Sequence, residues 1–209
     1  MTQIKDKSVQ VFLDELASKQ ATPGGGSAAA VMGAQGAALV AMVCNLTIGK
    51  PKYAEVDADM RALLAEAEVL RQTLIGMIKA DVDVFDKLMA CYALPKASED
   101  EKTFRGAQIQ QVLREATDVP LACAKACAQA IALSRVAAEK GSLAVISDAG
   151  VAVMTAYSGL KSAALNVHIN AAGLKDRDFA EARLAELDRL MSGIDGEVEA
   201  IYQLVKQKL

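Results

Sequence analysis

The chain has 209 residues, a length that favours one helical domain over residues 1–209 rather than two independent domains. Hydrophobic residues make up 53% of it but aromatic residues only 4%, so the core must be built from Ala, Leu, Val and Met, which favours packed helices over sheets. The 23 basic residues are dispersed among 26 acidic ones, with a net charge of −3, and this argues against nucleic acid as the main partner.

The first 25 residues carry several charges and contain no apolar run of signal-peptide length. We therefore expect a protein that is not exported. The four cysteines lie in apolar segments without metal-ligand spacing, so we expect reduced core residues in the cytoplasm and no metal site.

Glycine and proline positions divide the chain into helical segments, and no alternation of polarity requires a strand. The pattern predicts an all-α bundle of long antiparallel helices. A short helix over residues 8–18 comes first, and a helix over 28–48 follows the loop 22–27. No residue between Lys19 and Lys50 is charged, so a membrane span over 28–44 has to be considered. Its Ala and Gly content and Gln35 favour a buried central helix without membrane contact. One side of it carries small residues at three- and four-residue spacing, which are Ala29, Gly33, Gly36, Ala37 and Val40.

The third helix is expected over residues 56–92, with apolar residues at the three- and four-residue intervals of a bundle seam. A fourth begins near residue 100, is interrupted or kinked at Pro120, and resumes to residue 140. A fifth covers 143–172. One last amphipathic helix starts near residue 178 and continues its apolar stripe to Val205.

Asp81 occupies a position of the third helix's apolar seam, where an unpaired carboxylate is costly. Two interpretations stay open: a buried polar contact to a neighbouring helix, or a site residue used for chemistry. Asp83 is the weaker candidate, because Lys79 and Lys87 lie four residues to either side of it and can pair with it.

Asp148 and Asn166 are 18 residues apart in the fifth helix, and Asn170 lies one turn further along. They face the same way in an unbroken helix, but about 27 Å separates Asp148 from Asn166 by helical rise. They could serve opposite ends of an extended ligand or different sites in a dimer. Hydrogen bonding between helices is the structural alternative.

The glycine-rich segment Pro23, Gly24, Gly25, Gly26 and Ser27 precedes a helix with no acid in its first turn, a place that suits an anion. It lacks the spacing of a nucleotide-binding P-loop, and a flexible turn is the alternative. Lys50 and Lys52 flank Pro51 beyond the same helix; an ordinary solvated charge at a helix end is their structural alternative.

Several motifs together resemble the C-terminal family of formiminotransferase-cyclodeaminases. They are residues 22–27 (TPGGGS), 45–53 (NLTIGKPKY), 81–85 (DVDVF), 147–148 (SD) and 166–170 (NVHIN). The resemblance covers nearly the whole chain, and its specificity lies in the combination and order of the motifs. His168, the chain's one histidine, departs from the Arg that many relatives have there.

The resemblance implies a helical homodimer acting on a tetrahydrofolate derivative. We expect hydrolysis of 5,10-methenyltetrahydrofolate to 10-formyltetrahydrofolate; cyclodeamination of 5-formiminotetrahydrofolate is the alternative. No cofactor is needed, because the one-carbon group is already attached to folate. A noncatalytic helical scaffold is the alternative of another class.

The expected reaction and the chemical type of each side chain suggest roles for the candidate residues. Asp81 and Asp148 are the predicted catalytic carboxylates, with Asp81 as the base. The remaining candidates are predicted to bind substrate. They are Pro23, Gly24, Gly25, Gly26, Ser27, Lys50, Lys52, Tyr53, Asn166 and Asn170.

Overall fold

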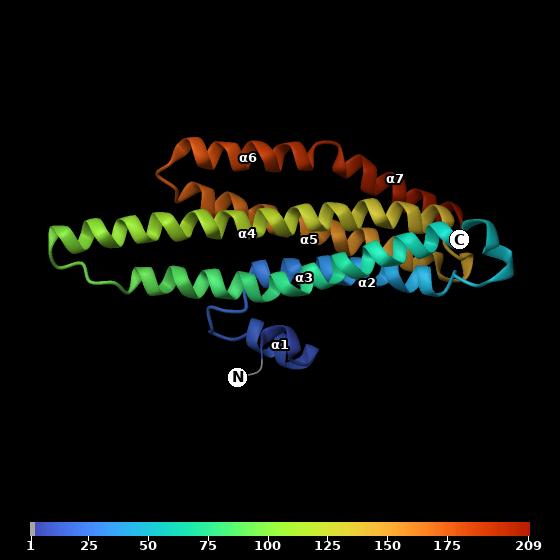
Figure 1. Cartoon of the computed structure of the whole chain (residues 1–209), viewed down its shortest axis with the longest axis horizontal. Helices are drawn as coiled ribbons and strands as arrows, with labels where there is room; N and C mark the ends of the chain where they lie inside the picture. The colour runs from blue at the N-terminus through green and yellow to red at the C-terminus, as the bar shows by residue number, and fades with distance from the viewer. Residues whose placement is uncertain (1–2) are drawn as a thin grey trace.

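The computed structural model describes residues 3–209, which form helices and contain no strand (Figure 1). The prediction of an all-α protein is confirmed. The main helices are α1 (Val9–Leu16), α2 (Gly25–Asn45), α3 (Asp57–Tyr92), α4 (Glu99–Lys140), α5 (Ile146–Ala172), α6 (Arg177–Met191) and α7 (Ile194–Gln207). Three short 3-10 helices accompany them: η1 (Ile4–Asp6), η2 (Pro51–Val56) and η3 (Leu143–Val145).

The two longest helices, α3 and α4, run along the length of the molecule and are joined at one end by residues 93–98 (Figure 1). A capping box starts α4, because the Ser98 hydroxyl and the Glu101 carboxylate accept each other's backbone N–H groups. Helices α2 and α5 pack against each other and against α4. In Figure 1, α6 and α7 lie along one edge of the bundle and α1 projects from the opposite edge.

The uncharged helix α2 packs unusually close to α5. Its predicted small-residue side is buried, and it includes Ala29, Gly33, Gly36, Ala37 and Val40. A Cβ atom added at Gly159 of α5 would lie 2.9 Å from the Ala29 carbonyl oxygen, and one at Gly36 would lie 3.0 Å from the Ala152 carbonyl oxygen. Side chains at these glycines would therefore push the two backbones apart.

Helix α4 is continuous through Pro120, so of the predicted interruption or kink the interruption is wrong, and the kink stays a prediction. Proline has no N–H group for the carbonyl four residues earlier, which belongs to Ala116. The side-chain amide of Asn170, from α5, donates a hydrogen bond to that carbonyl. A partner from the neighbouring helix thus satisfies the group that Pro120 leaves unpaired.

The prediction of one last helix was also wrong, because the chain turns between α6 and α7. Gly193 separates them with a φ of 77°, a left-handed conformation that glycine adopts without steric cost. The apolar stripe continues on both sides of the break. Its buried members are Leu187, Ile194, Val198, Ile201 and Val205.

Among the described residues, α2, α4 and the segment Leu143–Ala172 are long and apolar enough to cross a membrane by length and composition. In their most apolar windows, 56%, 56% and 44% of the residues are buried inside the bundle. Packing between helices thus accounts for much of this apolar character. The absence of a membrane partner stays a prediction.

Candidate active site

The glycine-rich segment is the start of a helix rather than a loop. Helix α2 begins at Gly25, so Gly25, Gly26 and Ser27 form its first turn. The N-cap, Gly24, supplies no side-chain hydrogen bond to this turn. Backbone N–H groups in a first turn have no partner within the helix, and they favour negative charge nearby.

The Asp81 carboxylate lies against this first turn. The Ser27 hydroxyl donates a hydrogen bond of 2.7 Å to Asp81 Oδ2, and a Cβ atom added at Gly26 would overlap the carboxylate. Asp81 is half-buried, whereas Asp83 is exposed and pairs with Lys79. The buried polar contact that the sequence left open is therefore present, and its partner is known.

Asn166 joins the same place from α5. A Cβ atom added at Gly25 would lie 3.9 Å from Asn166 Nδ2, and this amide donates a 2.9 Å hydrogen bond to the Ser162 carbonyl. We call Gly25, Gly26, Ser27, Asp81 and Asn166 the glycine-end cluster. Three helices supply it, with a carboxylate, an amide and free backbone donors.

A second group gathers beyond the other end of α2, and we call it the lysine-end cluster. Its members are Lys50, Lys52, Tyr53, Ser142 and Leu143. Lys50 Nζ lies 3.3 Å from the Ser142 hydroxyl, and the Tyr53 hydroxyl accepts a 2.9 Å hydrogen bond from the Leu143 N–H. That bond, with help from the Ser142 side chain, lowers the pKa of Tyr53.

Asp148 lies in the first turn of α5, six residues after Ser142, and is half-buried. A carboxylate there interacts favourably with the positive end of the helix dipole. The sequence did not single out Ser142 or Leu143 as site residues. The Gly141-Ser142 break between helices was their one signal, and the contacts to Lys50 and Tyr53 depend on the fold.

Most of the length of α2 separates the two clusters. Its 21 residues span about 30 Å at the rise of an α-helix. Asp148 lies about 27 Å along α5 from Asn166, which is beside Asp81, so Asp81 and Asp148 do not form a carboxylate pair within one chain. The expectation that Asp148 and Asn166 serve different ends of a ligand, or different sites in a dimer, fits this spacing.

The other candidates lie beside the glycine-end cluster. Pro23 is buried after a cis peptide bond from Thr22. Asn170, one turn beyond Asn166, is bonded to the Ala116 carbonyl of α4. His168 is exposed between them. Substrate binding by Pro23, Gly24 and Asn170 stays a prediction.

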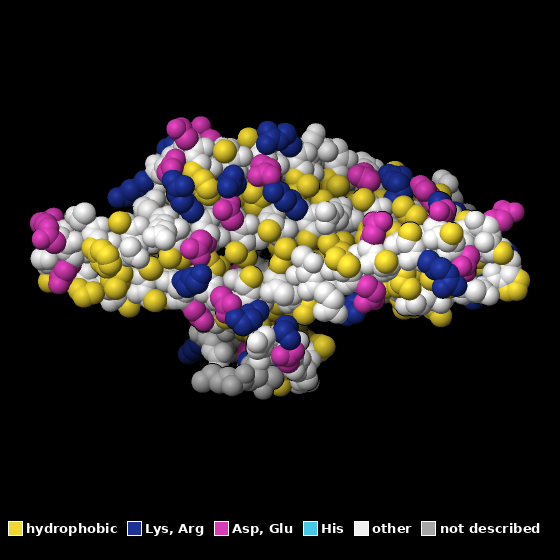
Figure 2. Space-filling view, viewed as in Figure 1, with side chains coloured by type: hydrophobic (Ala, Val, Ile, Leu, Met, Phe, Trp, Pro, Cys, Tyr) yellow, Lys and Arg dark blue, Asp and Glu magenta, His cyan; other side chains and the backbone are white. Residues whose placement is uncertain are grey.

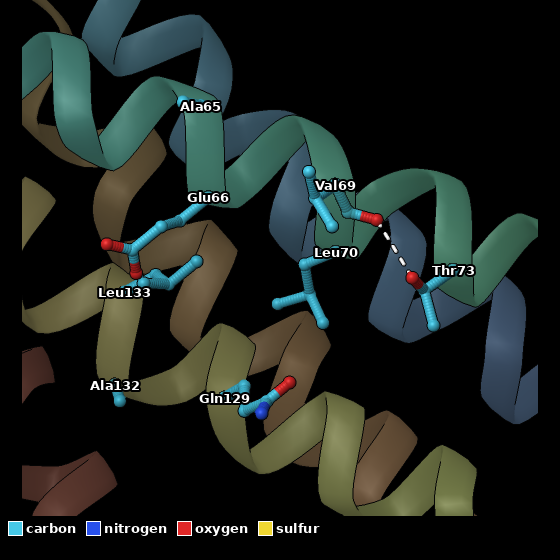
Figure 3. Close-up of a pocket in the computed structure, with 8 residues that line it drawn as sticks. All are labelled: Ala65, Glu66, Val69, Leu70, Thr73, Gln129, Ala132 and Leu133. Carbon is cyan, nitrogen blue, oxygen red and sulfur yellow. Dashed lines mark hydrogen bonds between the residues drawn. The ribbon is translucent and has the colours of Figure 1, made fainter.

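A groove of about 610 Å³ lies elsewhere, between α3 and α4 (Figure 3). Its lining consists of Ala65, Glu66, Val69, Leu70, Thr73, Gln129, Ala132 and Leu133, none of which is a predicted site residue. The face in Figure 2 carries acidic and basic side chains interspersed with apolar ones. Within residues 3–209, no three His, Cys, Asp or Glu side chains are grouped to hold a metal ion.

The sequence profile of the formiminotransferase-cyclodeaminase family matches residues 8–189. The chain belongs to this family. It is 57% identical to a methenyltetrahydrofolate cyclohydrolase of Methylorubrum extorquens, over 98% of both chains. It is 32% identical to the formimidoyltransferase-cyclodeaminase of Rattus norvegicus, covering 89% of this chain and 34% of that longer protein.

A solved family structure has the same fold. The crystal structure of formiminotetrahydrofolate cyclodeaminase from Thermotoga maritima superposes with a TM-score of 0.84 at 29% identity. The superposition covers 99% of this chain and 98% of that one. The family predicted from the motifs is therefore confirmed over nearly the whole length.

Proposed function

We propose that this protein hydrolyses 5,10-methenyltetrahydrofolate to 10-formyltetrahydrofolate in one-carbon metabolism. The observation that carries the proposal is the 57% identity, end to end, with a methenyltetrahydrofolate cyclohydrolase. The glycine-end cluster supports it, because a half-buried carboxylate and free helix donors lie together there. We place the reaction in the cytoplasm, without metal or organic cofactor.

The reaction adds water to the amidinium carbon between N5 and N10. A base accepts one water proton as the C–O bond forms. The bond from this carbon to N5 then breaks, its electron pair stays on N5, N5 gains a proton, and the new hydroxyl group loses its proton to become the formyl carbonyl. One proton is released overall. In our proposal Asp81 accepts the first proton and Asn166 orients the substrate. The free N–H groups in the first turn of α2 face negatively charged groups of the substrate.

The lysine-end cluster has a different part in this proposal. Lys50 and Lys52 carry ammonium groups that attract the glutamate carboxylates of folate. Lys52 Nζ also lies 5.8 Å from the ring centre of Tyr53, so the ammonium group and the aromatic ring form a cation–π contact. Asp148, the second carboxylate, would hold amide and amino donors of the pterin ring as a residue of a second copy of the chain, because most of the length of α2 separates it from Asp81 within its own chain.

We propose further that the protein is a homodimer of antiparallel helical bundles. Leu165 and Ile169 flank Asn166 on α5 and are 70% and 72% exposed, an apolar surface that a second copy would cover. A second copy could also supply a lysine-end cluster to each glycine-end cluster. Sedimentation velocity measures the oligomeric state. A stable monomer with full activity at low nanomolar concentration would contradict the homodimer.

Cyclodeamination of 5-formiminotetrahydrofolate is the second candidate. The observation that favours it is the fold shared with the Thermotoga maritima cyclodeaminase, with a TM-score of 0.84. The same base and helix donors could serve this reaction, since both act on the carbon bound to N5. A noncatalytic scaffold is the third candidate, and the half-buried Asp81 argues against it.

One spectroscopic assay separates the three. Purified protein is mixed with 5,10-methenyltetrahydrofolate, and the loss of its absorbance is followed against a blank, because the reaction also proceeds uncatalysed. Parallel samples with 5-formiminotetrahydrofolate are assayed for ammonia. We expect fast hydrolysis; ammonia release without hydrolysis would favour the cyclodeaminase, and neither activity would favour the scaffold.

A further inference from the structure

Ser27 is placed to act on Asp81 rather than on substrate. Its side chain is completely buried in the first turn of α2, so the hydroxyl has no access to a bound ligand. Its oxygen lies 2.7 Å from Asp81 Oδ2 and 3.4 Å from the backbone carbonyl of Ile78. Both partners belong to α3, so this hydroxyl fixes the carboxylate relative to the helix that carries it.

The neighbouring residue restricts the carboxylate from the other side. Gly26 has no Cβ atom, and one added there would overlap Asp81 Oδ1 and Cγ. The carboxylate therefore fits between the α2 backbone and the Ser27 hydroxyl. Oδ2 is engaged by Ser27, so in the proposed reaction Oδ1 is the oxygen that accepts the water proton.

The Ser27 hydroxyl can serve both protonation states of this carboxylate, because Oδ2 keeps lone pairs to accept its proton in either state. While Asp81 is ionised, the Ser27 O–H donates to Oδ2. After Oδ1 has taken a proton, Oδ2 is the carbonyl oxygen of the acid, and the Ser27 O–H still donates to it. Neither state leaves a buried polar group without a partner.

We propose that Ser27 is a positioning residue, which holds the Asp81 carboxylate in one orientation before and after proton transfer without touching substrate. The inference rests on the proposed function, in which Asp81 is the base. Misplacing a catalytic group by about 1 Å can lower a rate about a hundredfold, so this one hydrogen bond has a measurable consequence.

The first test compares Ser27→Ala with Ser134→Ala. Ser134 is also completely buried, but its hydroxyl donates to the Ala130 carbonyl within its own helix, α4. For hydrolysis of 5,10-methenyltetrahydrofolate, we expect Ser27→Ala to lower kcat about tenfold or more while KM changes less than about twofold. Ser134→Ala should keep both constants. A raised KM with unchanged kcat in Ser27→Ala would overturn the inference, because it would indicate a substrate contact.

The second test repeats Ser27→Ala in an Asp81→Ala background. The residual turnover, measured with excess enzyme, should then change less than about twofold, because the group that Ser27 positions is gone. The Tm loss caused by Ser27→Ala should likewise be smaller in that background. Equal losses of kcat or of Tm in both backgrounds would overturn the inference.

The two proposals fail in different ways. If the parent protein does not exceed the uncatalysed rate, the proposed function is wrong. The Tm comparison still tests the Ser27 contact in that case, since it needs no substrate. If the parent is active and Ser27→Ala is as active as the parent, the function stands and the positioning role is refuted.

Discussion

The side-chain amide of Asn170 donates to the Ala116 carbonyl, the group that Pro120 deprives of its helical partner. This contact joins the middle of α4 to α5, one turn beyond Asn166. It explains how α4 stays continuous through a proline. It also gives Asn170 a structural partner beside the proposed active site.

Asn170→Ala should lower the free energy of unfolding by about 1–3 kcal/mol, because it leaves a carbonyl without a partner. Urea denaturation followed by circular dichroism measures the loss. Pro120→Ala restores an N–H group at the right position in α4. In that background the loss from Asn170→Ala should be at least about 1 kcal/mol smaller. The same loss in both backgrounds would show that Pro120 and Asn170 are not coupled.

Gly159→Ala should destabilise the protein by about 1–3 kcal/mol, the usual effect of overpacking. The new Cβ atom would meet backbone atoms of α2, at 2.9 Å from the Ala29 oxygen and 3.0 Å from the Gly33 nitrogen, and backbone cannot rotate away. Gly76→Ala is the matched control, since nothing lies within 4 Å of a Cβ atom there. It should stabilise α3 by up to about 1 kcal/mol. Equal destabilisation by both would refute the close approach of α2 and α5.

Asp57 should make the segment that carries Lys50 and Lys52 sensitive to acid. Its carboxylate accepts a 2.7 Å hydrogen bond from the Gly49 N–H and pairs with Arg61, and these contacts hold the pKa of Asp57 below 3.8. When the pKa of a carboxyl group is lower in the folded protein than in the unfolded chain, the group stabilises the fold at pH values above its unfolded-state pKa. This stabilisation is lost as the pH falls through its folded-state pKa. The stability difference between parent and Asp57→Asn should therefore be present at neutral pH and shrink below about pH 3.8. A difference that is constant over this range, or one matched by the exposed Asp86→Asn, would contradict the prediction.

Replacing both lysines, in a Lys50→Gln, Lys52→Gln variant, should mainly raise KM. Their ammonium groups suit the mobile glutamate tail, and loss of uniform binding leaves kcat nearly unchanged. The KM effect should be larger for polyglutamyl than for monoglutamyl substrate and should shrink with added salt. If kcat collapses while KM stays constant for both substrates, one of these lysines acts at the reacting centre.

Much of the fold was readable from the sequence, because small apolar residues at helical spacing specify helices locally. The seam of α3 and the buried side of α2 followed from that spacing alone. The division between α6 and α7 was missed, since the apolar stripe continues across Gly193 at the spacing of a single helix. Continuity through Pro120 was missed because it depends on Asn170, 50 residues away in the sequence.

For the candidate site too, the sequence predicted some features and others depend on the fold. The sequence indicated that Asp81 needed a partner, and the fold identifies that partner as Ser27, 54 residues away. Spacing along one helix already excluded Asp148 and Asn166 from a single reacting centre. The contacts of Lys50 with Ser142 and of Tyr53 with Leu143 join segments about 90 residues apart, which no local pattern specifies.

The central claim is that Asp81 is the base of a folate hydrolase, and the turnover of Asp81→Asn with 5,10-methenyltetrahydrofolate tests it most directly. The amide keeps the shape and an oxygen for the Ser27 hydroxyl, so circular dichroism and Tm should show a folded bundle. It cannot accept the water proton, so turnover should fall at least about a hundredfold. A folded Asp81→Asn protein with near-normal turnover would remove Asp81 from the mechanism and contradict the account.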